Sequence, residues 1–230
     1  MGPGDYHETG RHTVGLVARK AGVRARDRVL DVGCGLGRMA LPLSDKIGRR
    51  GSYVGFDVVR AYTDWCRDHL GLDPRRFTFH HADIRTSFYN PDGKIEPEGF
   101  AFPWPDKSFD LAIATSLFTH LMPDAAAHYL AEIARVLAPG GRVFASFFLL
   151  DTLGREAAAT GATYPTFSAP MEHGLLHDPA VPESAVAYDP EWVRGRLTAA
   201  GLKVVGVHAG KWKNPSGGLD YQDVVVASRS

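Results

Sequence analysis

Short runs of Val, Ile, Leu and Phe recur along the chain, and segments with a helical spacing of apolar residues separate them. The helical spacing, with apolar side chains every three or four residues, is clearest over residues 61–70 and 124–137. Strands and helices that alternate in this way are typical of a parallel sheet covered by helices on both faces. The pattern therefore predicts an α/β fold, with strands over residues 28–32, 53–57, 77–81, 109–115 and 142–149.

Three further elements follow from local start and stop signals. A helix should follow Gly37, because apolar residues recur directly after it. Asp189-Pro190-Glu191 predicts the start of another helix, with Asp as the N-cap and Pro in the first turn, and Gly201 predicts its end. Residues 203–207 and 223–228 have strand composition, and we expect them to pair as a hairpin.

Two long stretches, residues 85–105 and 152–188, show no clear periodicity. Loops of this length in a compact domain are typically functional lids or disordered segments. Their aromatic side chains, among them Tyr89, are expected to form walls of a small-molecule pocket. No repeat or linker divides the chain, so we expect one domain over residues 1–230, with an N-terminal cap over about residues 1–26 and the two stretches as substrate-side insertions.

Composition narrows the choice of partners and compartment. The 26 basic residues balance 26 acidic ones, so the formal net charge is zero and no large field would draw the chain to nucleic acid or membranes. Two cysteines are too few for a disulfide framework, and no apolar stretch reaches roughly 18 residues. The first residues carry neither the basic nor the apolar region of a signal peptide. We therefore expect a cytoplasmic protein that binds neither nucleic acid nor membranes.

The strongest chemical signal is the run Asp31-Val32-Gly33-Cys34-Gly35-Leu36-Gly37, which begins inside the first predicted strand. Its glycines let the backbone pass close under a bulky ligand, where a Cβ atom would collide. Cys34 is interpreted as a small residue within this turn. The spacing is not the Gly-x-Gly-x-x-Gly of dinucleotide enzymes, which makes a nucleotide-dependent dehydrogenase the less favoured hypothesis.

Acidic residues also follow the second and third predicted strands. Asp57 would reach the crevice beside the glycine turn, where its carboxylate can accept hydrogen bonds from both hydroxyls of a ribose. Asp83 lies at the end of the next strand, where it can accept an amino hydrogen of adenine while Ile84 packs on the ring. Together these residues indicate an adenosine-bearing ligand at the carboxyl edge of the sheet.

With these residues the chain resembles the class I S-adenosylmethionine-dependent methyltransferases. The resemblance covers roughly residues 27–149 and extends to Ala82-Asp83-Ile84, to Phe102-Pro103-Trp104-Pro105-Asp106 with Phe109-Asp110, and to the run from Arg135 to Gly141. It implies a Rossmann-like, mostly parallel sheet of seven strands in the order 3-2-1-4-5-7-6, with the last strand antiparallel. It also implies S-adenosylmethionine as the cofactor. The residues expected to bind it are Asp31, Gly33, Cys34, Gly35, Gly37, Asp57, Val58, Asp83, Ile84 and Thr115.

The segment after the fourth strand, Ala114-Thr115-Ser116-Leu117-Phe118, bears on the methyl acceptor. It lacks the Asn/Asp-Pro-Pro-Tyr signature of adenine and glutamine methyltransferases. Thr115 cannot serve as the acid that holds magnesium in catechol enzymes of the family, and no two-glutamate loop of the protein-arginine enzymes is present. These differences favour a small-molecule acceptor and a reaction without a metal.

Histidines supply two further hypotheses. His120, just past the fourth strand, could remove the proton from a hydroxyl acceptor, or it could instead cap a helix or bond to the backbone. His173 and His177 lie four residues apart beside Asp178, and on a helix they would share a face as metal ligands do. Because that stretch has no independent helix signal, a lid with polar residues is favoured over a metal site.

The sequence therefore predicts an S-adenosylmethionine-dependent methyltransferase that acts on a small molecule such as a sugar or natural product, most readily at a hydroxyl. The alternative is a non-catalytic S-adenosylmethionine-binding subunit or sensor of the same fold. Aminopropyl transfer from a decarboxylated cofactor is less favoured, because paired acids for a polyamine are not found after the fourth strand. Neither the acceptor nor the oligomeric state follows from the sequence.

Overall fold

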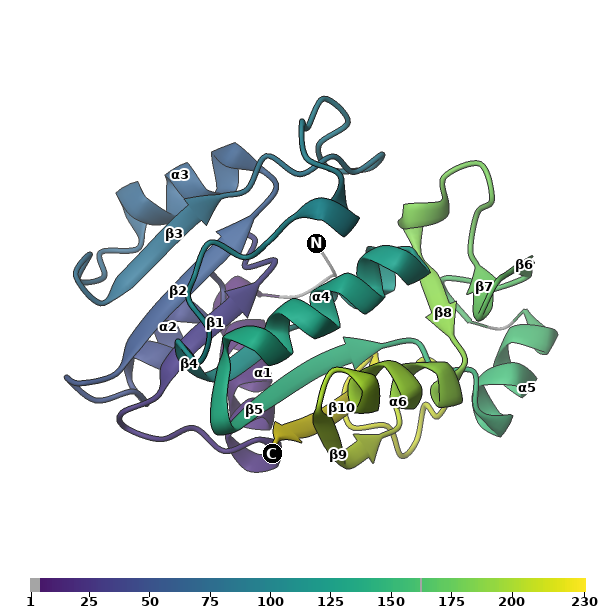
Figure 1. Cartoon of the computed structure of the whole chain (residues 1–230). Helices are drawn as coiled ribbons and strands as arrows, with labels where there is room; N and C mark the ends of the chain where they lie inside the picture. Colours follow the sequence, from purple (N-terminus) through teal and green to yellow (C-terminus); the bar gives the residue numbers. More distant parts are fainter. Residues whose placement is uncertain (1–4, 162) are drawn as a thin grey trace.

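A twisted sheet of seven strands runs through the molecule, with helices on both faces (Figure 1). The computed structural model describes residues 5–161 and 163–230. The strands are β1 (Arg28–Val32), β2 (Ser52–Asp57), β3 (Phe77–His81), β4 (Phe109–Ala114), β5 (Leu137–Phe147), β9 (Leu202–His208) and β10 (Asp223–Arg229). Their order is β3-β2-β1-β4-β5-β10-β9, and β10 is antiparallel to both of its neighbours. Numbered within the sheet, this order is 3-2-1-4-5-7-6, which confirms the predicted fold class.

Alternate residues of the central strands supply two separate hydrophobic cores. In β1, Leu30 packs into the core on one face of the sheet, whereas Val29 packs into the core on the other. Helices α4 (Pro123–Val136) and α6 (Pro190–Ala199) cover the first face, and α1 (Tyr6–Lys20), α2 (Ala40–Ser44) and α3 (Arg60–His69) cover the second. Strands that are buried on both faces must be apolar throughout, and these continuous apolar runs could therefore be recognised in the sequence.

The predicted strand over residues 142–149 starts earlier in the structure. Leu137 already pairs with Phe109, while the next pair along β5 joins Arg142 to Leu111. The residues between these two pairs, including Gly140 with a φ of +72°, interrupt the regular pairing of β4 with β5. The turn that was predicted to follow the helix therefore lies within the bounds of β5. The predicted helix ends and the other strand bounds differ from the observed ones by only a few residues.

The N-terminal segment and the second insertion contain elements that the sequence pattern did not predict. The proposed cap begins in residues 1–4, outside the described residues, and continues as α1. Within 152–188 lie α5 (Thr152–Thr160) and a small sheet of β6 (Ala169–Met171), β7 (Gly174–Leu176) and β8 (Val186–Tyr188). Strands of three residues are too short to give a period, so this stretch looked irregular in the sequence.

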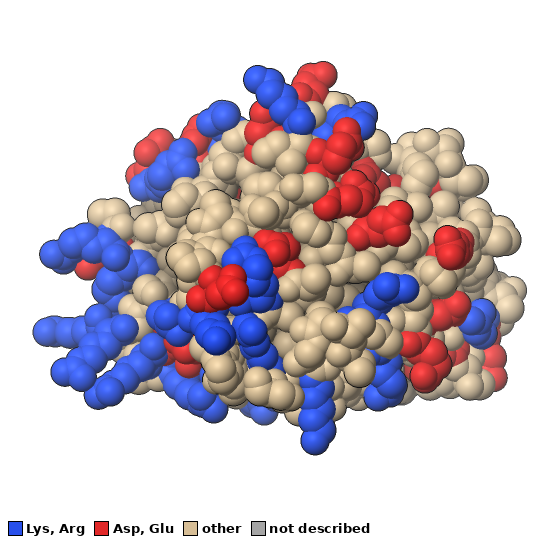
Figure 2. Space-filling view, in the orientation of Figure 1, with Lys and Arg blue, Asp and Glu red and all other residues tan. Residues whose placement is uncertain are grey.

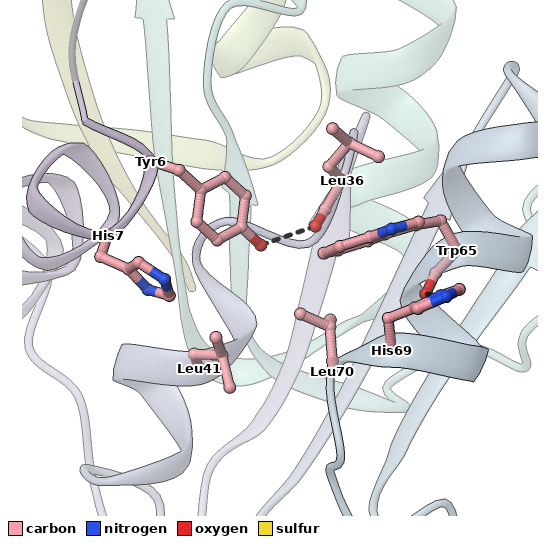
Figure 3. Close-up of a pocket in the computed structure, with 7 residues that line it drawn as sticks. All are labelled: Tyr6, His7, Leu36, Leu41, Trp65, His69 and Leu70. Carbon is pink, nitrogen blue, oxygen red and sulfur yellow. Dashed lines mark hydrogen bonds between the residues drawn. The ribbon is translucent and has the colours of Figure 1, made fainter.

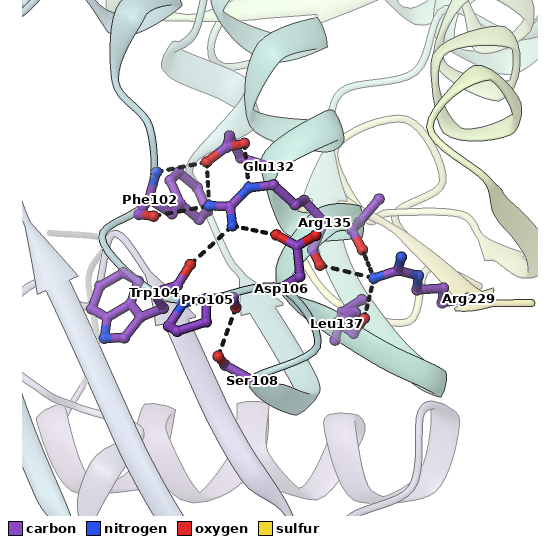
Figure 4. Close-up of polar contacts among 10 residues, drawn as sticks. Phe102, Trp104, Pro105, Asp106, Ser108, Glu132, Arg135, Leu137 and Arg229 are labelled. Carbon is purple, nitrogen blue, oxygen red and sulfur yellow. Dashed lines mark hydrogen bonds and ion pairs between the residues drawn. The ribbon is translucent and has the colours of Figure 1, made fainter.

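The first insertion is tied to α4 by a polar cluster around Arg135 (Figure 4). The guanidinium of Arg135 donates to the carbonyl oxygens of Phe102 and Trp104 at 2.9 Å and pairs with the carboxylates of Asp106 and Glu132. Glu132 in turn accepts a hydrogen bond from the Phe102 N–H at 2.6 Å. The end of residues 85–105 is therefore fixed to the scaffold.

Within residues 5–161 and 163–230, none of the helices has both the length and the apolar character needed to cross a membrane. The zero net charge is unevenly distributed on the face that Figure 2 shows. Basic side chains gather at its lower left, where β1, β2 and β3 begin, and several acidic side chains gather above, nearer the carboxyl ends of these strands.

A buried ion pair joins the middle of β5 to the connection between α1 and β1. The Asp27 carboxylate lies 2.5 Å from Nη2 of Arg142 and also accepts the Arg24 N–H at 2.8 Å. The same guanidinium donates to the carbonyl oxygens of Ala21 and Gly22. Because both charged side chains are less than one-tenth exposed, neither can be hydrated if its partner is removed.

Replacing Arg142 should therefore destabilise the fold far more than replacing an exposed arginine. We expect Arg142→Met to lower the free energy of unfolding by about 3–5 kcal/mol, since Asp27 is left buried and unpaired. The matched control is Arg28→Met, which breaks the more exposed pair with Asp110 and should cost about 0–1 kcal/mol. Urea unfolding measures both values. Equal losses for the two variants would contradict the assignment.

Candidate functional site

The glycine turn after β1 is bonded directly to the end of β2. The N–H groups of Gly33 and Cys34 both donate to the Phe56 carbonyl oxygen at 3.0 Å. Gly35 N–H donates to Oδ2 of Asp57 at 2.8 Å, while Oδ1 of the same carboxylate accepts the Val59 N–H at 2.9 Å. Asp57 therefore links the turn to the backbone that leads into α3, and its orientation is held from both sides.

The glycines of the turn are needed for different reasons. Gly35 has a φ of +53°, and a Cβ atom there would meet no other atom within 4 Å, so the space beside this residue is open to a ligand. Gly37 has a φ of +70°, but its Cβ would lie 2.7 Å from Cδ1 of Leu70 and 3.0 Å from Sγ of Cys66. Close packing of α3 on the turn therefore also demands glycine at position 37.

Asp31 is a fully buried acid with one uncommitted oxygen. The Tyr53 hydroxyl donates to Oδ2 at 2.5 Å, whereas no described residue donates to Oδ1. Burial, opposed by the hydrogen bond from Tyr53 and assisted by the nearby Asp57 carboxylate, raises the pKa of Asp31 to about 7. Burial also raises the pKa of Asp57, although the N–H groups of Val59 and Gly35 oppose that shift. Two such acids beside one turn suit a positively charged ligand.

The predicted residues at the ends of β3 and β2 lie on the same edge of the sheet. Asn90 of the first insertion donates from Nδ2 to Oδ1 of Asp83 at 3.3 Å and to the Ile84 carbonyl oxygen at 3.0 Å. Ile84 is buried in the core, and Val58 packs against the same core from the end of β2. The segment after β3 is thus held in place by the insertion that follows it.

Beyond β4, the chain turns sharply at Ser116, which has a φ of +54° although it is not glycine. Its N–H donates to Oγ of Ser146 in β5 at 2.7 Å, and the preceding Thr115 places its hydroxyl 3.9 Å from Sδ of Met39. Non-glycine residues in this conformation are uncommon and cluster at functional sites. The role of Ser146 was missed in the sequence, where its only signal is a hydroxyl in an otherwise apolar strand.

His120 lies in the short 3₁₀ turn Phe118–His120 that follows β4. Its Nδ1 lies 2.9 Å from the Glu183 carbonyl oxygen, which can only accept, so Nδ1 carries the proton. In the neutral ring Nε2 then holds the free lone pair. Burial lowers the pKa of His120, which keeps the ring neutral at physiological pH. The predicted bond to backbone is therefore present, and it leaves the second nitrogen available as a base.

Both insertions meet at this histidine. The rings of Phe88 and Tyr89, from the first insertion, have centroids 6.5 and 5.6 Å from the His120 ring. Glu183, from the second insertion, accepts a hydrogen bond from the Ser87 hydroxyl at 2.6 Å. The two insertions therefore contact each other through Glu183, the residue that also bonds to Nδ1 of His120.

A cavity of about 430 Å³ lies on the outer side of the glycine turn (Figure 3). Tyr6 of α1 borders it and donates from its hydroxyl to the Leu36 carbonyl oxygen at 2.7 Å. The complete lining is Tyr6, His7, Leu36, Leu41, Trp65, His69 and Leu70. This lining contains none of the residues expected to bind a cofactor, although Leu36 lies between Gly35 and Gly37 of the turn.

The histidine pair of the second insertion does not share a helix. His173 has a φ of +68° in the turn between β6 and β7, and its ring stacks on Trp192. His177 bonds from Nδ1 to the Thr166 carbonyl oxygen at 2.8 Å. Across residues 5–161 and 163–230, no three or more His, Cys, Asp or Glu side chains come together in a way that could hold a metal ion.

Comparison with known proteins places this geometry among methyltransferases. A family model described as a methyltransferase domain matches residues 29–141. Methyltransferase GfsG of Streptomyces halstedii is 32% identical over 77% of this chain and 59% of its own length. The 27-O-demethylrifamycin SV methyltransferase of Amycolatopsis mediterranei is 33% identical over 64% of this chain and 50% of its own. The chain thus spans little more than half the length of these relatives.

Solved structures share the fold. The crystal structure of an S-adenosylmethionine-dependent methyltransferase from Methanosarcina mazei superposes on this chain with a TM-score of 0.60. The alignment covers 90% of this chain and 94% of that one at 20% sequence identity. At such low identity the agreement concerns the architecture alone.

The buried acid of the turn should give the protein a distinctive pH dependence. Because the pKa of Asp31 is about 7 in the folded state against 3.8 ordinarily, the folded protein binds more protons between these values, and its stability falls as pH rises. Asp31→Asn removes this titration. The unfolding free energy of the variant relative to wild type should increase across that window, by up to about 4 kcal/mol.

Urea unfolding of both proteins at several pH values from about 4 to about 8 measures this difference. The control is Asp64→Asn, because Asp64 is an exposed acid of α3 whose loss should leave the pH dependence unchanged. A difference between Asp31→Asn and wild type that stays constant with pH would contradict the titration.

Proposed function

Since the chain belongs to the family of class I S-adenosylmethionine-dependent methyltransferases, we propose that it transfers a methyl group from this cofactor to a hydroxyl group of a small molecule. The observation that carries the hydroxyl assignment is the orientation of His120: its Nδ1–H donates to the Glu183 carbonyl oxygen, and within residues 5–161 and 163–230 no hydrogen bond engages its Nε2. The relative from Amycolatopsis mediterranei supports it, because its name describes methylation at an oxygen.

The residues at the strand ends fit the cofactor. Gly35 offers an open backbone surface for its methionine part, and Asp57 offers a carboxylate to the ribose hydroxyls. We assign the adenine amino group to Asp83, whose Oδ1 also accepts a hydrogen bond from Asn90. Asp31 is fully buried, so we expect it to act on a cationic ligand through its charge rather than by contact. When bound, S-adenosylmethionine supplies a methyl group on a positively charged sulfur, which makes that methyl electrophilic.

The chain's own contribution to the chemistry is to hold the acceptor and to remove its proton. Nε2 of neutral His120 takes the proton of the acceptor hydroxyl, and the oxygen keeps the lone pair that methyl transfer requires. The aromatic rings of Phe88 and Tyr89 lie against the His120 ring and offer an apolar surface to an acceptor. The hydrogen bond between Ser87 and Glu183 joins the two insertions near this histidine.

Cofactor binding is tested first by thermal unfolding. S-adenosylmethionine and S-adenosylhomocysteine, each at about 100 times its dissociation constant, should stabilise the protein by roughly 2.7 kcal/mol. For a chain of this size this corresponds to a rise of about 5–10 °C in Tm, with no rise for NAD. Asp57→Ala should abolish the rise and the control Asp64→Ala should keep it. No shift with either sulfur compound would overturn the proposed function.

The role of His120 is tested by kinetics on hydroxyl compounds that release S-adenosylhomocysteine in an acceptor screen. His120→Ala should lower kcat by about 10²- to 10⁴-fold, because the general base is lost. Its affinity for S-adenosylhomocysteine should stay unchanged, since the hydrogen bond of His120 within the described residues goes to Glu183 and not to the glycine turn. His208→Ala, on the edge strand β9, is the matched control and should keep full turnover. A fully active His120→Ala enzyme would remove this residue from the mechanism.

A further inference from the structure

A second polar group lies at the same edge of the sheet as His120, and the proposed reaction does not use it. Ser116 follows β4, Ser146 lies near the end of β5, and Gln222 directly precedes β10. Since β10 is antiparallel to β5, its start lies beside the carboxyl ends of the parallel strands. Ligands of such sheets bind at this edge.

Hydrogen bonds define how the Gln222 amide points. Ser146 Oγ accepts the Ser116 N–H, so its own hydroxyl hydrogen is free to donate to Oε1 of Gln222, 2.6 Å away. The Ser116 hydroxyl donates to the same oxygen at 3.1 Å. A distance of 2.6 Å is normal for O–H···O and short for N–H···O, which places the amide oxygen against the serines.

Two groups of this cluster are available to a ligand: Nε2 of Gln222 can donate a hydrogen bond, and the Ser116 hydroxyl oxygen can accept one. No described residue accepts a hydrogen bond from Nε2 of Gln222, and this half-buried side chain is not sealed in the core. The Ser116 oxygen has already committed its hydrogen to Gln222, so it can only accept from a ligand. Nε2 can only donate. A donor beside an acceptor matches a hydroxyl group, which both accepts and donates, whereas a carboxylate would meet the Ser116 lone pairs.

The backbone that carries Gln222 is rigidly held. The next residue, Asp223, is fully buried and accepts hydrogen bonds from the Leu149 N–H and from Nε1 of Trp212, both at 2.8 Å. Its other oxygen pairs with the buried ammonium of Lys213 at 2.9 Å. A polar group mounted on such a network is pre-organised for binding, because little freedom is lost when a ligand arrives.

We propose that Gln222 and Ser116 bind a second hydroxyl group of the methyl acceptor, which makes the acceptor a polyhydroxylated compound such as a sugar or a polyol. The inference rests on the proposed function for the methylated hydroxyl beside His120. It adds a specificity site between the end of β4 and the start of β10 that recognises a hydroxyl the enzyme leaves unmethylated.

The test compares ring alcohols that differ by one hydroxyl. Dissociation constants of trans-cyclohexane-1,2-diol, trans-cyclohexane-1,4-diol and cyclohexanol are measured by NMR titration, with and without S-adenosylhomocysteine. We expect at least one diol to bind wild-type protein about 3- to 10-fold more tightly than cyclohexanol, the contribution of one added hydrogen-bonded group.

Two variants assign that preference to the cluster. Gln222→Met keeps the length of the side chain and removes the N–H donor without adding a charged acceptor, and Ser116→Gly removes the hydroxyl while accepting the positive φ without strain. Both should bind the diols no better than cyclohexanol, with S-adenosylhomocysteine affinity within about two-fold of wild type. Ser108→Ala, whose hydroxyl bonds to Pro105 elsewhere, is the control and should keep the preference.

Each outcome decides between the two proposals. A preference for a diol that survives in both variants, or no detectable diol binding to wild type, would overturn the hydroxyl site. If S-adenosylhomocysteine binds normally in those cases, the proposed methyl transfer is unaffected. If S-adenosylhomocysteine fails to bind while the diol preference still depends on Gln222, the hydroxyl site is supported and the methyl transfer is not.

Discussion

The site depends on one carboxylate that joins two strands. Asp57 accepts the N–H of Gly35 from the turn after β1 and the N–H of Val59 at the approach to α3. Because these bonds orient both oxygens, the open backbone at Gly35 and the acid that would face a ribose are held as one unit. The neighbouring acid, Asp31, is fully buried, and its charge is stabilised by a hydrogen bond from Tyr53 and by the nearby Arg38. The turn thus places two acids with raised pKa values where a cationic cofactor would be bound.

The scaffold could be predicted from the sequence because its strands are buried on both faces and its turn needs glycine. The run around Val29 and Leu30 had to be apolar throughout, and the fold class that it indicated is confirmed. The second insertion could not be predicted, since β6, β7 and β8 are three-residue strands held by pairing with one another. The residues named for the cofactor stay predictions, although the structure brings them to one edge of the sheet.

The residues proposed to bind the methyl acceptor could not be predicted from the sequence, for a different reason. Ser116, Ser146 and Gln222 are far apart in the sequence, and only the antiparallel return of β10 brings Gln222 beside the end of β5. No short motif encodes such a cluster. His120 was found because it follows a predicted strand, but its free nitrogen became evident only from the carbonyl of Glu183, which lies in a stretch without a recognisable pattern.

Glu183 has a consequence for how the proposed methyltransferase could be re-engineered. Its backbone oxygen orients His120, while its carboxylate holds Ser87 of the other insertion. Grafting a foreign loop over 152–188 to accept a new substrate would therefore also replace the group that selects the tautomer of the base. Exchanging the loop therefore also changes the environment of His120, because Glu183 belongs to the loop. We expect turnover to be preserved only by an exchange that keeps the Glu183 carbonyl oxygen in its present position.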